Sequence, residues 1–156
     1  MFENDLSILL RVLIAMILTG VLGWERESAG KAAGIRTHML VGIGAVLFVA
    51  LAEIYVARYE QNNPNMRIDP IRTVEAVVTA IGFIGAGTIF VTRDKVQGLT
   101  TAASIWTTAA VGMIVGLERY FLAVSSTVIV FIILRIVSLI EKEKFKTDEE
   151  NVKSEE

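Results

Sequence analysis

The chain has 156 residues, 53% of which are hydrophobic, and its 15 basic and 17 acidic residues leave a net charge of −2. This length predicts one domain, and the charge balance argues against a nucleic-acid partner. Because the chain has no cysteine, disulfides and thiolate metal sites are excluded. Long apolar segments alternate with charged ones, which indicates an all-α protein embedded in a lipid bilayer.

Five apolar segments are long enough to cross a membrane, since a transmembrane helix needs about 20 mainly apolar residues. No Lys or Arg precedes the first segment, which argues against a cleavable signal peptide. Arg11 interrupts this first segment, and we expect its side chain to reach the nearer membrane interface as an anchor. We expect one transmembrane domain over residues 1–140 and a charged, disordered tail over residues 141–156. Its helices are expected at about residues 6–24, 39–57, 74–92, 99–117 and 120–140.

Basic residues predict the orientation of this bundle, because Lys and Arg concentrate on the cytoplasmic side of a membrane. The opposite loops contain fewer of them, at positions 58, 67, 72 and 119. We therefore expect the N-terminus outside and the C-terminus in the cytoplasm. The loops after the first and third segments and the start of the tail contain Arg26, Lys31, Arg36, Arg93, Lys95, Lys142, Lys144 and Lys146.

The third and fourth segments are rich in small residues and are joined by a charged connection at residues 93–97. In the fourth segment the small residues recur at spacings of three and four, so they share one helix face. Such faces allow close helix packing in membranes. We expect this pair to form the core of the bundle, and its small-residue faces to mediate self-association. The residues concerned are Ala80, Gly82, Gly85, Ala86 and Gly87 in the third segment and Thr101, Ser104, Thr108 and Gly112 in the fourth.

Carboxylates gather around the loop between the second and third segments. Glu53 and Glu75 flank this loop, which itself carries Glu60 and Asp69. Carboxylate oxygens are suitable ligands for Mg²⁺, so Glu53, Asp69 and Glu75 form a candidate metal site at the outer mouth. Three arginines in the same stretch support a second interpretation, in which the carboxylates form interfacial ion pairs.

A charged segment on the opposite side contains Glu25, Arg26, Arg36 and His38, and the other loop on that side carries residues 93–95. We expect Glu25 to pair with Arg36 and Arg26 to pair with Asp94, which would lock the helices together. Thr37 directly precedes the second segment and is a candidate N-cap. The alternative interpretation is an anion-binding or partner-docking site, in which His38 would respond to pH.

Helix four is unusually polar for a membrane span, since it carries Thr100, Thr101, Ser104, Thr107 and Thr108. These hydroxyls either line a hydrated path or bond to the helix backbone and allow close packing; we favour the second. Catalysis has no support, because the chain has one histidine and no nucleotide-binding or zinc-protease motif. We expect no enzymatic activity and no cofactor, except that the carboxylates at the outer mouth could bind Mg²⁺.

Several motifs in order along the chain resemble those of the MgtC/SapB family of bacterial inner-membrane proteins. The first consists of GWERE at residues 23–27 and AGIRTHMLV at 33–41; the later ones are Asp69-Pro70, IGFIGAG at 81–87 and GLTTAASIW at 98–106. Ala80 departs from the family pattern, which often has glycine there. The resemblance assigns a structural or partner-docking role to Glu25, Arg26, Arg36, Thr37, His38, Gly82, Gly85, Gly87, Thr100, Thr101 and Ser104.

The resemblance also implies a function. Members of this family are associated with magnesium limitation, acid stress and survival inside host cells, and longer members modulate membrane partners such as the F-type ATP synthase and transport ATPases. Those longer members carry a soluble domain similar to ACT domains, whereas this sequence ends shortly after its fifth segment, which is similar to the short SapB type. The alternative function is a transporter or channel component for Mg²⁺ or another cation.

Overall fold

The computed structural model describes residues 2–62, 69, 71–92 and 95–136. Four labelled helices and one β-hairpin follow one another along the chain, and a further helix, Tyr120–Ile136, comes after α4. The predicted tail, residues 141–156, and the Asp94 partner expected for Arg26 lie outside the described residues. The labelled elements are α1 (Phe2–Ser28), α2 (Ile35–Asn62), α3 (Ile71–Ala86), β1 (Phe90–Thr92), β2 (Lys95–Gln97) and α4 (Leu99–Gly116).

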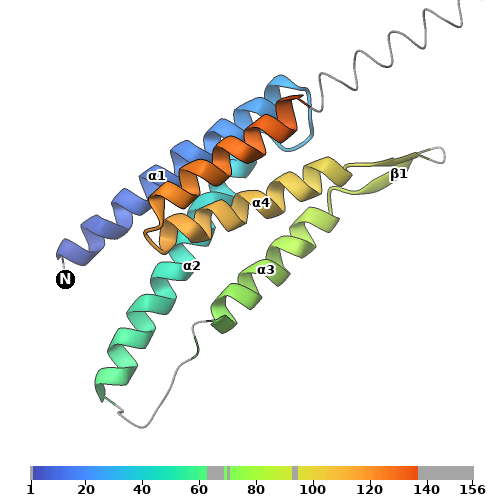
Figure 1. Ribbon diagram of the computed structural model, residues 1–156. Helices are drawn as coiled ribbons and strands as arrows, with labels where there is room; N and C mark the ends of the chain where they lie inside the picture. Colours follow the sequence, from blue (N-terminus) through green and yellow to red (C-terminus); the bar gives the residue numbers. More distant parts are fainter. Residues whose placement is uncertain (1, 63–68, 70, 93–94, 137–156) are drawn as a thin grey trace, which may run out of the picture.

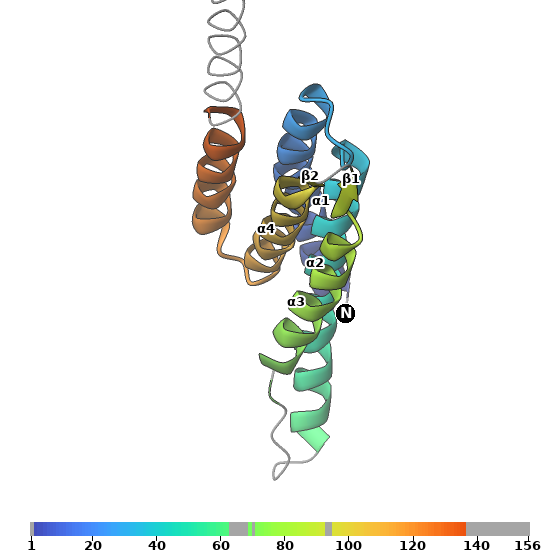
Figure 2. The ribbon, with the colours of Figure 1, turned by 90° about the vertical axis from the view of Figure 1, so that its right-hand side faces the viewer.

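Consecutive helices run up and down the bundle (Figure 1). The helices α1, α2 and α4 all contact one another, whereas α3 packs on α4 and on part of α2. The Tyr120–Ile136 helix joins this core through Ala123, which packs in one apolar cluster with Ala15, Val46 and Val115. Seen from the side, α3 and the Tyr120–Ile136 helix lie on opposite sides of α4 (Figure 2).

Three helices in the described part of the chain are long and apolar enough to cross a membrane: α1, α2 and α4. The protein is therefore a mostly helical, multi-pass membrane protein. The α3 helix has 16 residues, which corresponds to about 24 Å of helix and is shorter than the roughly 30 Å of a bilayer interior. The Tyr120–Ile136 helix is also apolar, and Ile136 is the last described residue of the chain.

The first three helices begin and end at other residues than predicted, and three of these differences bear on the site. The first helix continues through the charged residues after position 24, because Glu25 and Arg26 are buried and paired with each other. The second helix begins at Ile35, four residues before the predicted start. The third helix ends at Ala86, and the predicted helical residues 90–92 form instead one strand of a short antiparallel hairpin.

The central helix of the bundle is α4, whose buried residues cover more than one face. By contrast, α3 buries one stripe, formed by Val77, Ile81 and Gly85 at spacings of four. The prediction that the third and fourth segments together form the core is therefore wrong for α3, which is peripheral. Gly85 does lie against α4, near Ala102, whereas Gly82 is exposed and has open space beside it.

Glycines allow the closest helix contacts of the core. A Cβ atom at Gly112 of α4 would lie 2.6 Å from the backbone oxygen of Gly42 in α2. A Cβ atom at Gly42 would in turn collide with Thr19 of α1. Glycine at position 42 therefore lets α2 approach α1, and glycine at position 112 lets α4 approach α2. Gly98, with φ +89°, allows the left-handed turn that leads from the hairpin into α4.

Candidate functional site: a buried polar network

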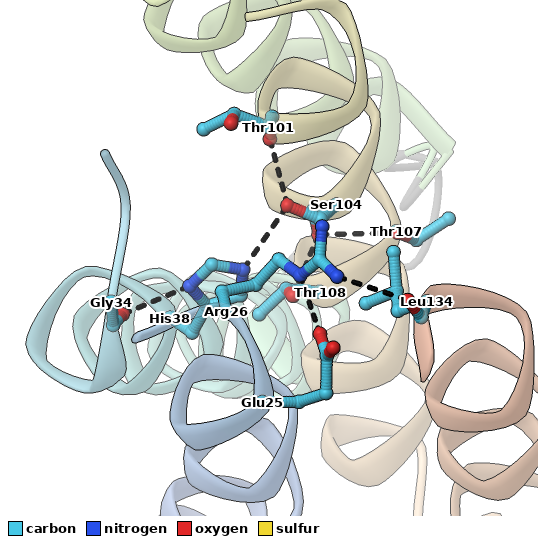
Figure 3. A network of polar contacts seen from close by, with 9 residues as sticks. All are labelled: Glu25, Arg26, Gly34, His38, Thr101, Ser104, Thr107, Thr108 and Leu134. Carbon is cyan, nitrogen blue, oxygen red and sulfur yellow. Dashed lines mark hydrogen bonds and ion pairs between the residues drawn. The ribbon is translucent and has the colours of Figure 1, made fainter. Parts of the chain in front are cut away.

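Two charged residues at the end of α1 are enclosed by the bundle (Figure 3). Glu25 and Arg26 are each only 1% exposed. The Arg26 Nε atom donates to Glu25 Oε2 at 2.5 Å, and another guanidinium nitrogen donates to the backbone oxygen of Leu134 at 3.1 Å. Buried charges need such partners, because an unpaired one costs several kcal/mol. This pair therefore connects α1 to the Tyr120–Ile136 helix.

The same network includes the single histidine of the chain. His38 lies in the first turns of α2 and is completely buried. Its Nδ1 atom is 2.9 Å from the backbone oxygen of Gly34, and its Nε2 atom is 3.3 Å from the Ser104 hydroxyl of α4. The ring thus bridges the start of α2 to the middle of α4, beside the Glu25–Arg26 pair.

Hydroxyl groups of α4 form the floor of this network. Ser104 donates to the backbone oxygen of Thr101, and Thr108 donates to that of Ser104. Thr107 likewise donates to backbone oxygens of its own helix. Ser104, Thr107 and Thr108 therefore show the backbone bonding that we favoured for the hydroxyl groups of helix four. The predicted shared face is also confirmed, because Thr101, Ser104, Thr108 and Gly112 are all buried.

Local sequence explains how α1 and α2 come close enough to enclose these groups. A Cβ atom at Gly23 would lie 2.7 Å from the Cα atom of Ile35, so only glycine permits this contact. The carboxylate of Glu27 accepts a hydrogen bond from the Ile35 backbone N–H at 2.9 Å and thereby caps α2. The prediction that Thr37 is the N-cap is wrong, because α2 begins two residues earlier and Glu27 takes this role.

A second charged cluster lies near the other end of α1. Arg11 is 8% exposed and donates to Glu53 Oε2 at 2.7 Å and to the backbone oxygen of Gly116 at 2.8 Å. It also forms an ion pair with Glu118, at 2.5 Å. The expectation that Arg11 reaches the membrane interface as an anchor is therefore wrong. Arg11 connects α1 to α2 and to the turn after α4.

The three carboxylates predicted to form a metal site, Glu53, Asp69 and Glu75, have different surroundings in the structure. Glu53 is paired with Arg11, and Asp69 accepts a hydrogen bond from the Ile71 backbone N–H at 3.0 Å at the start of α3. Glu75 is exposed on α3, in a shallow depression that it shares with Arg72 and Thr79. Among the described residues, no three or more His, Cys, Asp or Glu side chains are grouped closely enough to hold a metal ion. The side chain of Glu60 is not described.

A cavity of about 660 Å³ opens between α2 and α3, next to Glu53. Its walls are formed by apolar residues of α2 from Val49 to Ala57, by the start of α3 and by Leu117. Glu53 is the charged residue of this lining. The lining of the cavity is therefore apolar except near Glu53 and Thr73, and the Glu53 carboxylate is already paired with Arg11.

The structure brings together five of the residues that the family motifs single out: Glu25, Arg26, His38, Thr101 and Ser104. The expected pairing of Glu25 with Arg36 is wrong, because Glu25 pairs with Arg26 and Arg36 is exposed. Outside the network lie the other motif residues: Arg36, Thr37, Gly82, Gly85, Gly87 and Thr100.

The sequence also contained a signal for Arg11 that the segment-by-segment interpretation missed. Arg11 and Arg26 lie on the same face of α1 as Ala15, Thr19 and Leu22, at spacings of three and four, and all five residues are buried. Small residues on the same stripe as a charged one indicate a helix face that packs on protein. A charge on such a stripe is expected to find a partner inside the bundle.

The fold and the network together define a multi-pass α-helical membrane protein whose helices are held together by buried ion pairs and hydroxyl groups. A sequence model of the MgtC family matches residues 12–143. This match covers most of the chain, so the chain belongs to the MgtC family, as its motifs predicted.

Three relatives illustrate the extent of the similarity. The "Putative magnesium transporter YhiD" of Escherichia coli K12 is 41% identical over 128 residues, which are 82% of this chain and 59% of the relative. Protein SrpB of Synechococcus elongatus is 37% identical over 78% of this chain and 70% of its own length. Protein MgtC of Brucella abortus is 38% identical over 65% of this chain and 39% of its own length. No solved structure matches the chain.

Proposed function

We propose that this protein acts in the bacterial inner membrane as an adaptation protein under magnesium limitation, acid stress or survival inside host cells, by contacting and modulating other membrane proteins. Membership of the MgtC family supports the proposal. The observation that carries it is that Arg26 bonds to the Tyr120–Ile136 helix and His38 bonds to Ser104 of α4, so both side chains point into the bundle. Polar groups used in this way stabilise a scaffold. The proposal assigns no catalytic role.

A scaffold of this kind leaves much of its helix surface for lipid or for partners. Of the residues in the apolar part of each span, the protein itself buries 33% in α1, 28% in α2 and 50% in α4. The outer surface of α3 combines small residues with Arg72, Glu75 and Thr79. Small and polar residues on a membrane helix favour contact with another protein over contact with lipid tails. We therefore assign partner contact first to α3, with a transport ATPase or the ATP synthase as the class of partner.

The proposed topology has five helices in the membrane, with the N-terminus outside and the C-terminus in the cytoplasm. The alternation of α1, α2, α3, α4 and the Tyr120–Ile136 helix along the bundle supports it. In this topology the Glu25–His38 network lies toward the cytoplasmic side. The cluster of Arg11, Glu53 and Glu118 lies toward the outer side.

The alternative function is transport of Mg²⁺ or another cation. It is supported by the printed name of the YhiD relative and by the cavity beside Glu53. In this alternative Glu53, Asp69 and Glu75 attract the cation at the outer mouth. Mg²⁺ would keep several of its waters there and bind one or two carboxylates directly.

Ion flux into liposomes that contain only the purified protein separates the two functions. Mg²⁺ and H⁺ are followed separately for the unmodified protein, for Glu75→Gln and for Asp5→Asn, which removes an exposed carboxylate of α1 and serves as the matched control. No flux above that of empty liposomes, from protein shown to be folded, is the result expected for a regulatory scaffold. Flux that Glu75→Gln abolishes and Asp5→Asn preserves would overturn the proposal in favour of transport.

A further inference from the structure

The hydrogen bonds of His38 define where its ring protons lie. The ring is 0% exposed, so these bonds have no competition from bulk water. Its Nδ1 atom is 2.9 Å from the backbone oxygen of Gly34. A carbonyl oxygen can only accept a hydrogen bond, so Nδ1 carries a hydrogen and donates it. The contact of Nε2 with Ser104 then depends on whether Nε2 also carries one.

Ser104 has one hydroxyl hydrogen and two atoms within reach of it. Its Oγ atom is 2.8 Å from the backbone oxygen of Thr101 and 3.3 Å from His38 Nε2. With a neutral ring, Nε2 has no hydrogen and can only accept, so a hydrogen bond between Nε2 and Ser104 requires the Ser104 hydroxyl to turn from Thr101 to Nε2. With a protonated ring, Nε2 donates to Ser104, whose own hydrogen stays on Thr101. The two states differ by one proton and by one rotation of the Ser104 hydroxyl.

Two charged groups of opposite sign act on this ring. Both lie on α1: Glu25 favours a second proton on the ring, and Arg26 opposes it. The α4 helix contributes hydroxyl groups here and contains no charged residue. One oxygen of Glu25 binds Arg26, while the other, Oε1, is buried and has no hydrogen-bond partner among the described residues. Glu25 therefore has an unused carboxylate oxygen in the same network as the histidine ring.

We propose that His38 and Ser104 form a buried proton-binding site, in which Nε2 of His38 takes up a proton and the Ser104 hydroxyl reports this by turning from His38 to the Thr101 backbone oxygen. The ligand is a proton taken from solution, and no covalent bond other than N–H forms. Glu25 favours the new positive charge and Arg26 opposes it, so we expect uptake only on acidification. The site joins α1, α2 and α4, so proton uptake acts on the contact between the start of α2 and α4. This inference does not depend on the proposed regulatory function.

The chain is well suited to a direct test, because it contains one histidine. Protein labelled with ¹⁵N-histidine, purified with a histidine-free tag and placed in lipid nanodiscs, gives one pair of ring-nitrogen resonances. At neutral pH we expect the Nδ1–H tautomer, with Nε2 unprotonated. On acidification we expect Nε2 to become protonated while the protein stays folded. An Nε2–H tautomer at neutral pH, or a ring that remains neutral until the protein unfolds, would overturn the proposal.

A variant pair tests the role of Ser104. In Ser104→Ala we expect the Nε2 resonance of the neutral ring to shift to the position of a nitrogen without a hydrogen bond, while Nδ1 stays unchanged. The matched control is Thr107→Ala, because the Thr107 hydroxyl bonds only to backbone oxygens of its own helix. An Nε2 resonance that is unchanged in Ser104→Ala would contradict the assignment. If Ser104→Ala does not fold, Ser104→Thr, which keeps a hydroxyl, is expected to retain the original resonance.

Discussion

Replacing Arg26 by methionine tests whether the buried ion pair holds the bundle together. The substitution keeps an unbranched side chain of similar length, but it leaves the Glu25 carboxylate, 1% exposed, without its cation. Breaking a buried pair in this way costs about 3–5 kcal/mol, because the remaining charge is neither solvated nor compensated. The substitution also removes the hydrogen bond to the Leu134 backbone oxygen, which adds about 1 kcal/mol. We therefore expect Arg26→Met to lower the free energy of unfolding by about 4–6 kcal/mol.

The double variant Glu25→Met/Arg26→Met separates the cost of the lone charge from the cost of lost packing. It removes both charges, and replacing a buried ion pair by apolar side chains of similar size is often nearly neutral. We expect the double variant to lose about 1 kcal/mol, mainly from the bond to Leu134. The measurement is reversible unfolding in mixed micelles as the fraction of SDS increases, followed by circular dichroism. If the losses measured for the single variants Glu25→Met and Arg26→Met simply add up in the double variant, the two side chains do not act as a pair and the reasoning is refuted.

Two other predictions follow from close contacts and from the second cluster. Gly112→Ala would push a methyl group against the backbone of Gly42 and should cost about 1–3 kcal/mol in the same unfolding measurement, whereas Gly44→Ala, where a Cβ atom meets nothing within 4 Å, should cost nothing. Equal losses in the two alanine variants would contradict the helix contact. Arg11→Met should cost only about 1–2 kcal/mol, because Glu53 is 46% exposed and water can solvate it. A loss as large as that of Arg26→Met would show that this cluster is not solvated.

Much of the fold could be predicted from hydropathy, because apolar length decides whether a segment can cross a membrane. The α4 helix, Leu99–Gly116, corresponds closely to the predicted 99–117. The prediction failed where tertiary contacts override local polarity. Glu25 and Arg26 look like a membrane edge in the sequence, yet their mutual pairing lets α1 continue. Residues 90–92 pair with residues 95–97 in a hairpin instead of extending α3, an arrangement that depends on pairing between Phe90 and Gln97 and on the turn at Gly98.

The candidate site was partly visible in the sequence for a physical reason. Charged and hydroxyl residues inside or beside an apolar segment are costly unless they find partners, so their presence indicates a network. The partners themselves could not be predicted, because they depend on which helix faces meet. Glu25 had several cations within reach along the chain, and in the structure it pairs with the adjacent Arg26 while Arg36 is exposed.

The distribution of buried charge separates the helices into two groups. Arg11 and Arg26 fix α1 at two levels, about 22 Å apart along the helix, and their partners lie on α2, after α4 and on the Tyr120–Ile136 helix. The α3 helix packs on the bundle through the stripe of Val77, Ile81 and Gly85. The α3 helix thus packs through one narrow apolar stripe, whereas the two buried arginines of α1 reach several other parts of the bundle.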